Sequence, residues 1–210
     1  MRRIALAFTA LVSVALLSGA GQQAPQRLHR AYSDEQRVLL DRVSASLNAI
    51  RSLQSGFIQI GPDGAVEQGT LFIEKPGRIR FQYNAPSPVL IVATGGAVYV
   101  KNARLNTVDR YSLSDTPLGL LLNERVDLAR NQAVIGVQER DGAIIVNART
   151  STNRNNSNIT LVFSSGNVEL RQWTVRDNQG GNTTVALQSP QVGPTLENAL
   201  FAVPVKSPSA

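Results

Sequence analysis

The chain has 210 residues, of which 42% are hydrophobic and 17% charged, with a formal net charge of +6 and no cysteine. This composition excludes a disordered chain, a disulfide-stabilised scaffold and any site built on thiolates. The single histidine, His29, excludes a multi-histidine metal site and leaves little for a histidine-based catalytic triad.

The first 20 residues have the pattern of a secretory signal peptide. Arg2 and Arg3 precede an apolar run over 4–17, and small residues follow at 18–20. The run is shorter than the ~20 residues of a membrane-spanning helix, so a cleaved signal is favoured over a membrane anchor. We predict an exported protein with a signal peptide over 1–20, a loose leader over 21–32 and a single domain over 33–206.

Cleavage would remove two of the positive charges behind the net +6 and leave +4. Such a mild basic excess suits an anionic membrane surface but is too small to predict nucleic-acid binding.

An amphipathic helix is expected at the start of the domain. Ser33 and Gln36 have the spacing of a capping box, and an apolar stripe with helical periodicity follows them. The stripe consists of Leu40, Val43, Leu47 and Ile50. It predicts a helix over 34–50 that lies on an apolar surface.

The rest of the domain has the texture of an antiparallel β-meander. Short runs with a period of two are separated at regular intervals by turn residues such as those at 61–64, 95–96 and 140–142. The expected strands are 55–60, 67–75, 78–83, 88–93, 97–101, 107–113, 133–139, 143–149, 159–164, 168–176 and 182–189. The fold class is therefore mainly β.

Two stretches interrupt the meander. Thr116 and Pro117 are expected to cap and open a short apolar helix that ends at Leu122, and the polar stretch 149–158 is expected to be a loop.

The alternation is clearest over 78–83, where Arg78 and Arg80 lie opposite three apolar side chains. These arginines are interpreted either as a solvated strand face or as a strip that faces a partner or a membrane. Ile79, Phe81 and Tyr83 form the opposite, inward face.

The patterns leave open what the strands enclose. Eleven strands enclose more space than side chains fill in a small barrel, and the chain has few bulky residues, so an apolar pocket is one reading. A β-sandwich with an ordinary packed core is the other. There is no G-x-S-x-G nucleophile elbow, no glycine-rich phosphate loop before a helix and no clustered pair of carboxylates, so we predict no enzyme, no metal and no cofactor.

Several passages resemble the family of periplasmic outer-membrane lipoprotein carriers, LolA. The helix-to-strand passage 47–59 and the hairpin 69–83, with its G-x-L-x-I-x-K-P core, are similar to that family. So are the strand and turn at 88–96, the Thr116-Pro117-Leu118 start of the mid-chain helix and the closing Phe201-x-Val203-Pro204.

The resemblance implies a fold and a function. The fold is an incomplete, strongly curved antiparallel barrel with helices inserted as a lid. The function is non-enzymatic carriage of acylated lipoproteins through the periplasm of a Gram-negative bacterium. The implied partners are an inner-membrane ABC-type releasing complex and an outer-membrane lipoprotein receptor, and the protein is expected to be a monomer. A periplasmic regulator of the same fold that senses lipids or lipoproteins is the alternative.

The resemblance also assigns the candidate site. The lipid-cavity candidates are Phe57, Leu71, Ile73, Ile79, Phe81 and Tyr83, and the lid candidates are Leu40, Val43, Leu47, Ile50, Leu118, Leu121 and Leu122. Each of them could equally be an ordinary core residue. Phe81 stands where the family usually has tryptophan.

Lys75 stands where the best-known members of the family have an arginine that latches the empty lid. We expect Lys75 to bond carbonyl groups at the end of the short helix 117–122, or alternatively to reach solvent at the end of its strand.

Overall fold

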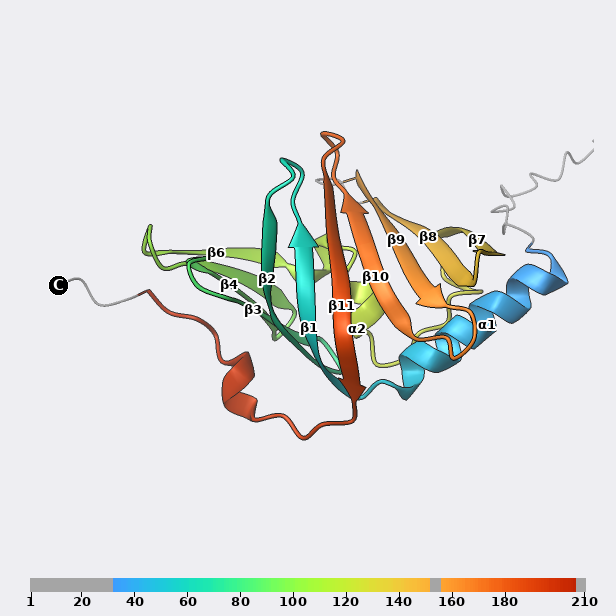
Figure 1. The fold of residues 1–210 in the computed structure, drawn as a ribbon, viewed down its shortest axis with the longest axis horizontal. Coiled ribbons are helices and arrows are strands. Elements are labelled where there is room, and N and C mark those ends of the chain that lie inside the picture. Colours follow the sequence, from blue (N-terminus) through green and yellow to red (C-terminus); the bar gives the residue numbers. More distant parts are fainter. Residues whose placement is uncertain (1–31, 152–155, 207–210) are drawn as a thin grey trace, which may run out of the picture. The chain divides into compact units, whose positions relative to one another are not determined.

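The computed structural model describes residues 32–151 and 156–206. They form one 11-stranded antiparallel sheet with a long helix, a short helix and two 3₁₀ turns (Figure 1). The predicted signal peptide, His29 and all of the predicted leader except Tyr32 lie outside the described residues. The hydroxyl of Tyr32 donates to the carbonyl of Val134 at 2.9 Å, so this end of the leader is held against the sheet.

The sheet consists of two meanders joined by their first and last strands. Its order is β6-β5-β4-β3-β2-β1-β11-β10-β9-β8-β7, so β6 and β7 are its edges and it is not closed. The strands are β1 (Ser52–Ile60), β2 (Val66–Glu74), β3 (Arg78–Tyr83), β4 (Val89–Thr94), β5 (Ala97–Asn102), β6 (Thr107–Ser112), β7 (Val134–Arg140), β8 (Ala143–Ser151), β9 (Asn156–Ser164), β10 (Leu170–Arg176) and β11 (Asn182–Val192). All eleven predicted strands and the mainly β fold class are confirmed.

The long helix, α1 (Asp34–Ala49), begins at the predicted capping box. The Ser33 side chain accepts a bond from the Gln36 amide at 3.2 Å, and the Gln36 side chain accepts one from the Ser33 amide at 3.1 Å. The stripe behind it is buried, which confirms the predicted helix. In Figure 1, α1 crosses the half of the sheet formed by β7–β10, and α2 (Gly119–Leu122) lies behind β11.

Two glycine positions show how closely the first meander is built. Gly95 and Gly96 both have positive φ values, 56° and 75°, as the tight turn between β4 and β5 requires. A Cβ atom on Gly69 of β2 would lie 2.1 Å from the carbonyl oxygen of Gln82 and 2.8 Å from the ring of Phe57. The missing side chain at Gly69 therefore lets β3 and the Phe57 ring approach β2.

Two expectations about the interruptions were wrong. Residues 149–151 and 156–158 of this stretch are strand, because Arg149 pairs with Asn158, β8 continues to Ser151 and β9 begins at Asn156, whereas 152–155 lie outside the described residues. Backbone pairing between neighbouring strands does not need apolar side chains, so a polar composition did not predict a loop here. The short helix is not capped by Thr116 either. Its first flanking residue is Leu118, and the Thr116 hydroxyl instead bonds the carbonyl of Leu113 at 2.8 Å, at the end of the 3₁₀ turn η1 (Leu113–Asp115).

Candidate functional site

The inner face of the sheet is apolar and carries an aromatic cluster. Phe57 of β1 makes edge-to-face contacts with Phe81 at 5.4 Å and Tyr83 at 5.2 Å between ring centroids. Trp173 of β10, which belongs to the other meander, contacts Phe81 at 6.2 Å. The two halves of the sheet therefore meet across this interior. Trp173 was not predicted as a site residue, although it is the single tryptophan and alternates with polar neighbours in its strand.

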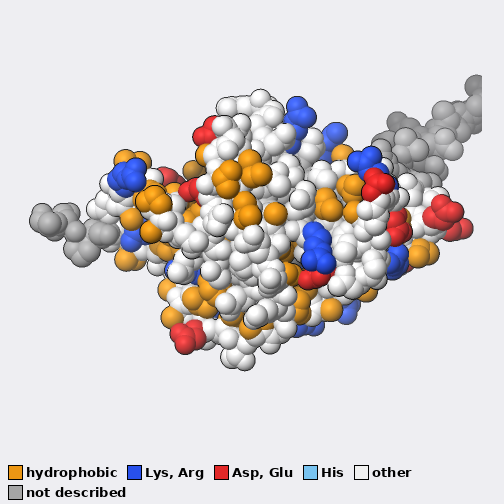
Figure 2. Space-filling view, viewed as in Figure 1, with side chains coloured by type: hydrophobic (Ala, Val, Ile, Leu, Met, Phe, Trp, Pro, Cys, Tyr) orange, Lys and Arg blue, Asp and Glu red, His pale blue; other side chains and the backbone are white. Residues whose placement is uncertain are grey.

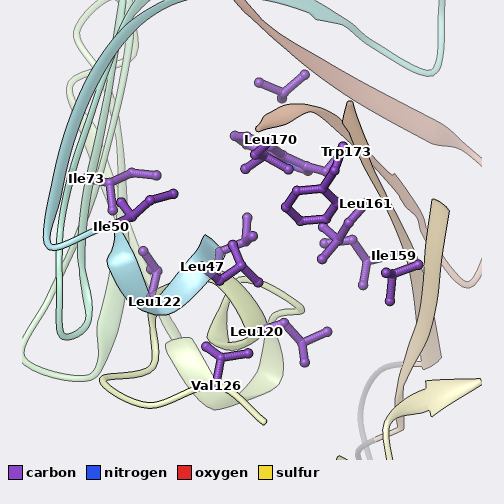
Figure 3. Close-up of a cluster of buried hydrophobic side chains, with 14 of the residues drawn as sticks. Leu47, Ile50, Ile73, Leu120, Leu122, Val126, Ile159, Leu161, Leu170 and Trp173 are labelled. Carbon is purple, nitrogen blue, oxygen red and sulfur yellow. The ribbon is translucent and has the colours of Figure 1, made fainter. Parts of the chain in front are cut away.

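The structure brings all the predicted cavity and lid residues into one apolar cluster. The predicted sheet residues Phe57, Leu71, Ile73, Ile79, Phe81 and Tyr83 are buried, as are the helix residues Leu40, Val43, Leu47, Ile50, Leu121 and Leu122. Leu118 is half-buried and packs against them, and Leu120, which was not predicted, is buried as well. Figure 3 shows Leu47 lying between Leu122 on one side and Leu161 on the other.

Polar contacts fix α1 over this cluster. The side-chain amide of Asn48 donates to the carbonyl of Val126 and accepts from the Val126 amide, both at 2.8 Å. The buried hydroxyl of Ser44 accepts from the Leu128 amide at 3.0 Å. These bonds join the last half of α1 to the segment that follows α2, so the two helical elements are linked as a cover.

Lys75 is buried, with 9% of its surface exposed, and its Nζ donates to the carbonyl oxygen of Leu47 at 2.7 Å. This carbonyl belongs to the last turn of α1, where the helix dipole favours a cation. The predicted acceptor, the end of 117–122, was wrong, and so was the alternative in which Lys75 reaches solvent. Burial, with the nearby charge of Arg51, lowers the pKa of Lys75 to about 8.

The same turn is also tied to the short helix. The amide of Gly77 donates to the carbonyl of Leu122 at 2.9 Å. The β2–β3 turn thus contacts the end of α1 through Lys75 and the end of α2 through Gly77. The side-chain alternation of β2 continues to Lys75 and points it inward, while the backbone of Gly77 faces α2.

The inner face has few polar groups, and one at its edge, the Tyr83 hydroxyl, is hydrogen-bonded. The Tyr83 hydroxyl donates to the side chain of Gln59 at 2.9 Å. Burial and the charge of Glu67 raise the pKa of Tyr83 to about 12, so this phenol stays neutral at physiological pH. Ser157, near the start of β9, is also buried, and its hydroxyl has no hydrogen-bond partner among the described residues.

The outer face of β3 differs from both readings of its arginines. Arg78 lies 5.0 Å from the centroid of the Phe201 ring and pairs with Glu74 at 2.6 Å. Arg80 donates to the carbonyl of Leu200 at 3.1 Å. The 3₁₀ turn η2 (Asn198–Phe201) therefore crosses this face, and the arginines anchor it rather than standing free in solvent.

In the ranges 32–151 and 156–206, no group of three or more His, Cys, Asp or Glu side chains could hold a metal ion. Within the same residues no helix is both long and apolar enough to cross a membrane.

The family model of the outer membrane lipoprotein carrier protein LolA matches residues 48–204 of the chain. An outer-membrane lipoprotein carrier protein of Dechloromonas aromatica is 26% identical over 172 residues, covering 77% of this chain and 81% of that protein. The corresponding protein of Methylococcus capsulatus is 26% identical over 169 residues, covering 76% and 80%.

Among solved structures, a LolA superfamily protein from Nitrosomonas europaea is 11% identical, covers 80% of this chain and 97% of its own, and has a TM-score of 0.42. The MucA/MucB complex of Pseudomonas aeruginosa gives 12% identity, coverage of 80% and 60%, and a TM-score of 0.43. Likenesses this distant add nothing to the family assignment. That assignment rests on the family model, which spans the first strand to the last 3₁₀ turn and confirms the resemblance in the motifs. The chain belongs to the LolA family of outer membrane lipoprotein carrier proteins.

Proposed function

We propose that this protein carries acylated lipoproteins through the periplasm by shielding their acyl chains between the inner face of the sheet and the helical cover. The observation that carries the proposal is the cover itself. The sheet is open between β6 and β7, and its apolar inner face is closed by α1 and α2 rather than by further strands. A cover attached at a few points can move away from a sheet without breaking strand pairing.

The energetics favour reversible loading. Transfer of an acyl chain from water into an apolar site gains ~0.8 kcal/mol per CH₂ group. In the closed protein, buried leucines of α1 and α2 occupy the same inner face, so loading must first expose them. That cost offsets part of the gain, lowers the net affinity and allows release without a nucleotide.

The direction of transfer then depends on the partners. We propose that an inner-membrane ABC-type complex supplies the lipoprotein and that an outer-membrane receptor with higher affinity for the acyl chains accepts it. The latch in this proposal is the bond from Lys75 to the carbonyl of Leu47, which holds the end of α1 on the β2–β3 turn.

The test is native mass spectrometry of the protein isolated from periplasm, together with binding of an apolar reporter dye. We expect bound lipoprotein or lipid, one saturable dye site, and displacement of the dye by a triacylated peptide. Dye binding that appears only on unfolding would refute the carrier. Phe81→Glu should abolish displaceable binding, because it places an unpaired carboxylate on the inner face. Val38→Glu, at a site on α1 that is 57% exposed, is the control and should bind normally.

A further inference from the structure

The outer face of β3–β6 carries cations and no carboxylates. The strand register sets one row across these strands, in which Arg80, Val92, Tyr99 and Arg110 are successive partners. A second row contains Gln82, Leu90, Lys101 and Val108. Partners in adjacent strands point to the same side of a sheet, so all these side chains lie on the outer face.

Some of these cations are used within the protein. Arg78 pairs with Glu74 and donates to the side chain of Asn198 at 2.8 Å, and Arg80 bonds the Leu200 carbonyl. Three other cations form no ion pair with any residue that the structure describes: Lys101 of β5, Arg104 in the turn after β5, and Arg110 of β6.

The unpaired cations lie close to one another. Lys101 is the partner of Val108, and Arg110 follows two residues later in the same strand, so the two are diagonal neighbours at ~7–8 Å. Like charges at this spacing repel each other. An anionic surface laid against the sheet would replace that repulsion with attraction.

An exposed apolar side chain lies next to one of these cations. Leu105, at the tip of the β5–β6 turn and next to Arg104, is 68% exposed. Figure 2 shows hydrophobic side chains and Lys or Arg side chains lying next to one another over the part of the sheet formed by β3–β6.

We propose that the part of this face that η2 leaves open, on β5 and β6, docks together with the 103–106 turn on the surface of an anionic phospholipid bilayer. The combination of groups favours lipid over an acidic protein. A projecting leucine can enter the boundary of the acyl chains while the adjacent guanidinium stays at the level of the phosphates. Lys101 and Arg110 then face the anionic headgroups.

This inference does not depend on the proposed function, because it concerns the face of the sheet opposite the helical cover. Docking would nevertheless place a carrier at the membrane where its cargo is loaded or released. The attraction acts over about 8 Å at physiological ionic strength, so it must weaken with added salt.

The experiment is co-sedimentation of the exported protein with phosphatidylcholine vesicles, with and without phosphatidylglycerol, at low and high salt. Each cation near an anionic surface contributes about fivefold to partitioning. The Lys101→Gln/Arg110→Gln variant should therefore bind anionic vesicles about 25-fold more weakly. Leu105→Ser should also weaken binding. The charge-matched control is Arg140→Gln/Arg176→Gln, whose residues are exposed on β7 and β10 of the other half of the sheet. It should bind like the wild type.

Binding to anionic vesicles that is lost in high salt and in the Lys101/Arg110 variant, but kept in the control, supports the proposal. No binding by the wild type overturns it, as does equal loss in both double variants, which would indicate a general charge effect. Circular dichroism checks that each variant is folded. Dye binding measured in parallel distinguishes the carrier proposal from the docking proposal. Vesicle binding can be absent while the dye site persists, and the dye site can be absent while vesicle binding persists.

Discussion

Replacing Lys75 tests the latch directly. Lys75→Leu removes the donor to the Leu47 carbonyl and keeps apolar bulk at the β2–β3 turn. The Leu47 carbonyl keeps its bond from the Ile50 amide at 3.3 Å, but the direct bond between the end of α1 and the β2–β3 turn is lost. The last turn of α1 should therefore detach more readily from the sheet.

The size of the effect follows from the bond. A hydrogen bond from a charged group contributes about 1.5–3 kcal/mol, and each ~1.4 kcal/mol changes an equilibrium tenfold. The open population of the empty protein should rise about 10- to 100-fold. Global stability should change much less, because burial of a cation is costly, as the lowered pKa of Lys75 indicates, and apolar replacement removes that cost.

Stopped-flow dye binding and transfer of a triacylated peptide to acceptor vesicles measure the two consequences. Lys75→Leu should load at least about tenfold faster and release more slowly, since a weaker closed state competes less with ligand. Lys75→Arg keeps a cationic donor and should stay closer to the wild type. Wild-type loading and release rates in a folded Lys75→Leu variant would show that no latch exists at this bond.

Three other perturbations test the remaining physical arguments. Gly69→Ala should lower the unfolding free energy by more than ~3 kcal/mol in urea denaturation, because its Cβ would meet a backbone carbonyl 2.1 Å away, whereas Gly136→Ala has open space and should be neutral within ~1 kcal/mol. Phe201→Ala should cost about 3 kcal/mol, since this ring is 3% exposed, and a loss below ~0.5 kcal/mol would show that η2 adds no stability. The pKa of Lys75 in the folded protein is about 8, below its usual value. Between about pH 8 and 10 the unfolded chain therefore holds a proton that the folded protein has lost. The free energy of unfolding of the wild type should rise there by up to ~1.4 kcal/mol per pH unit relative to Lys75→Leu. The raised pKa of Tyr83, about 12, has the opposite effect above about pH 10, and a flat difference between the two proteins over pH 8–10 would contradict the assignment.

Local signals in the sequence predicted most of the fold. The capping box at Ser33 and the stripe after it involve residues within a few turns of one another, so α1 could be placed from the sequence alone. The strands were predicted because alternation is a property of each strand by itself. The start of the short helix was predicted wrongly because threonine is a common helix N-cap, whereas Thr116 ends the preceding 3₁₀ turn.

Long-range contacts explain what the sequence did not predict. The alternation of side chains along β2 correctly predicted that Lys75 points inward, but the residue that accepts its hydrogen bond, Leu47, lies 28 residues earlier in the chain. No periodic pattern says which helix end meets a given turn. Likewise, the alternation in β3 placed Arg78 and Arg80 on the outer face, but it could not show that η2 crosses that face, because coverage by a distant segment leaves no mark on the strand.

The division of the buried apolar residues into two groups has a consequence for a carrier. Val92, Ala97 and Phe201 are buried but lie apart from the large inner cluster. Val92 and Ala97 are on the outward register of β4 and β5, and η2 contacts β3 and β4. The inner cluster is shared between sheet and cover, so any ligand that enters must compete with the protein for its own apolar contacts. The outer group is not exposed by that exchange. Strand pairing and the outer group can thus hold β3–β5 in place while α1 and α2 move. Opening of the helical cover then costs only the contacts of the inner cluster, and its free energy is distinct from that of unfolding the sheet.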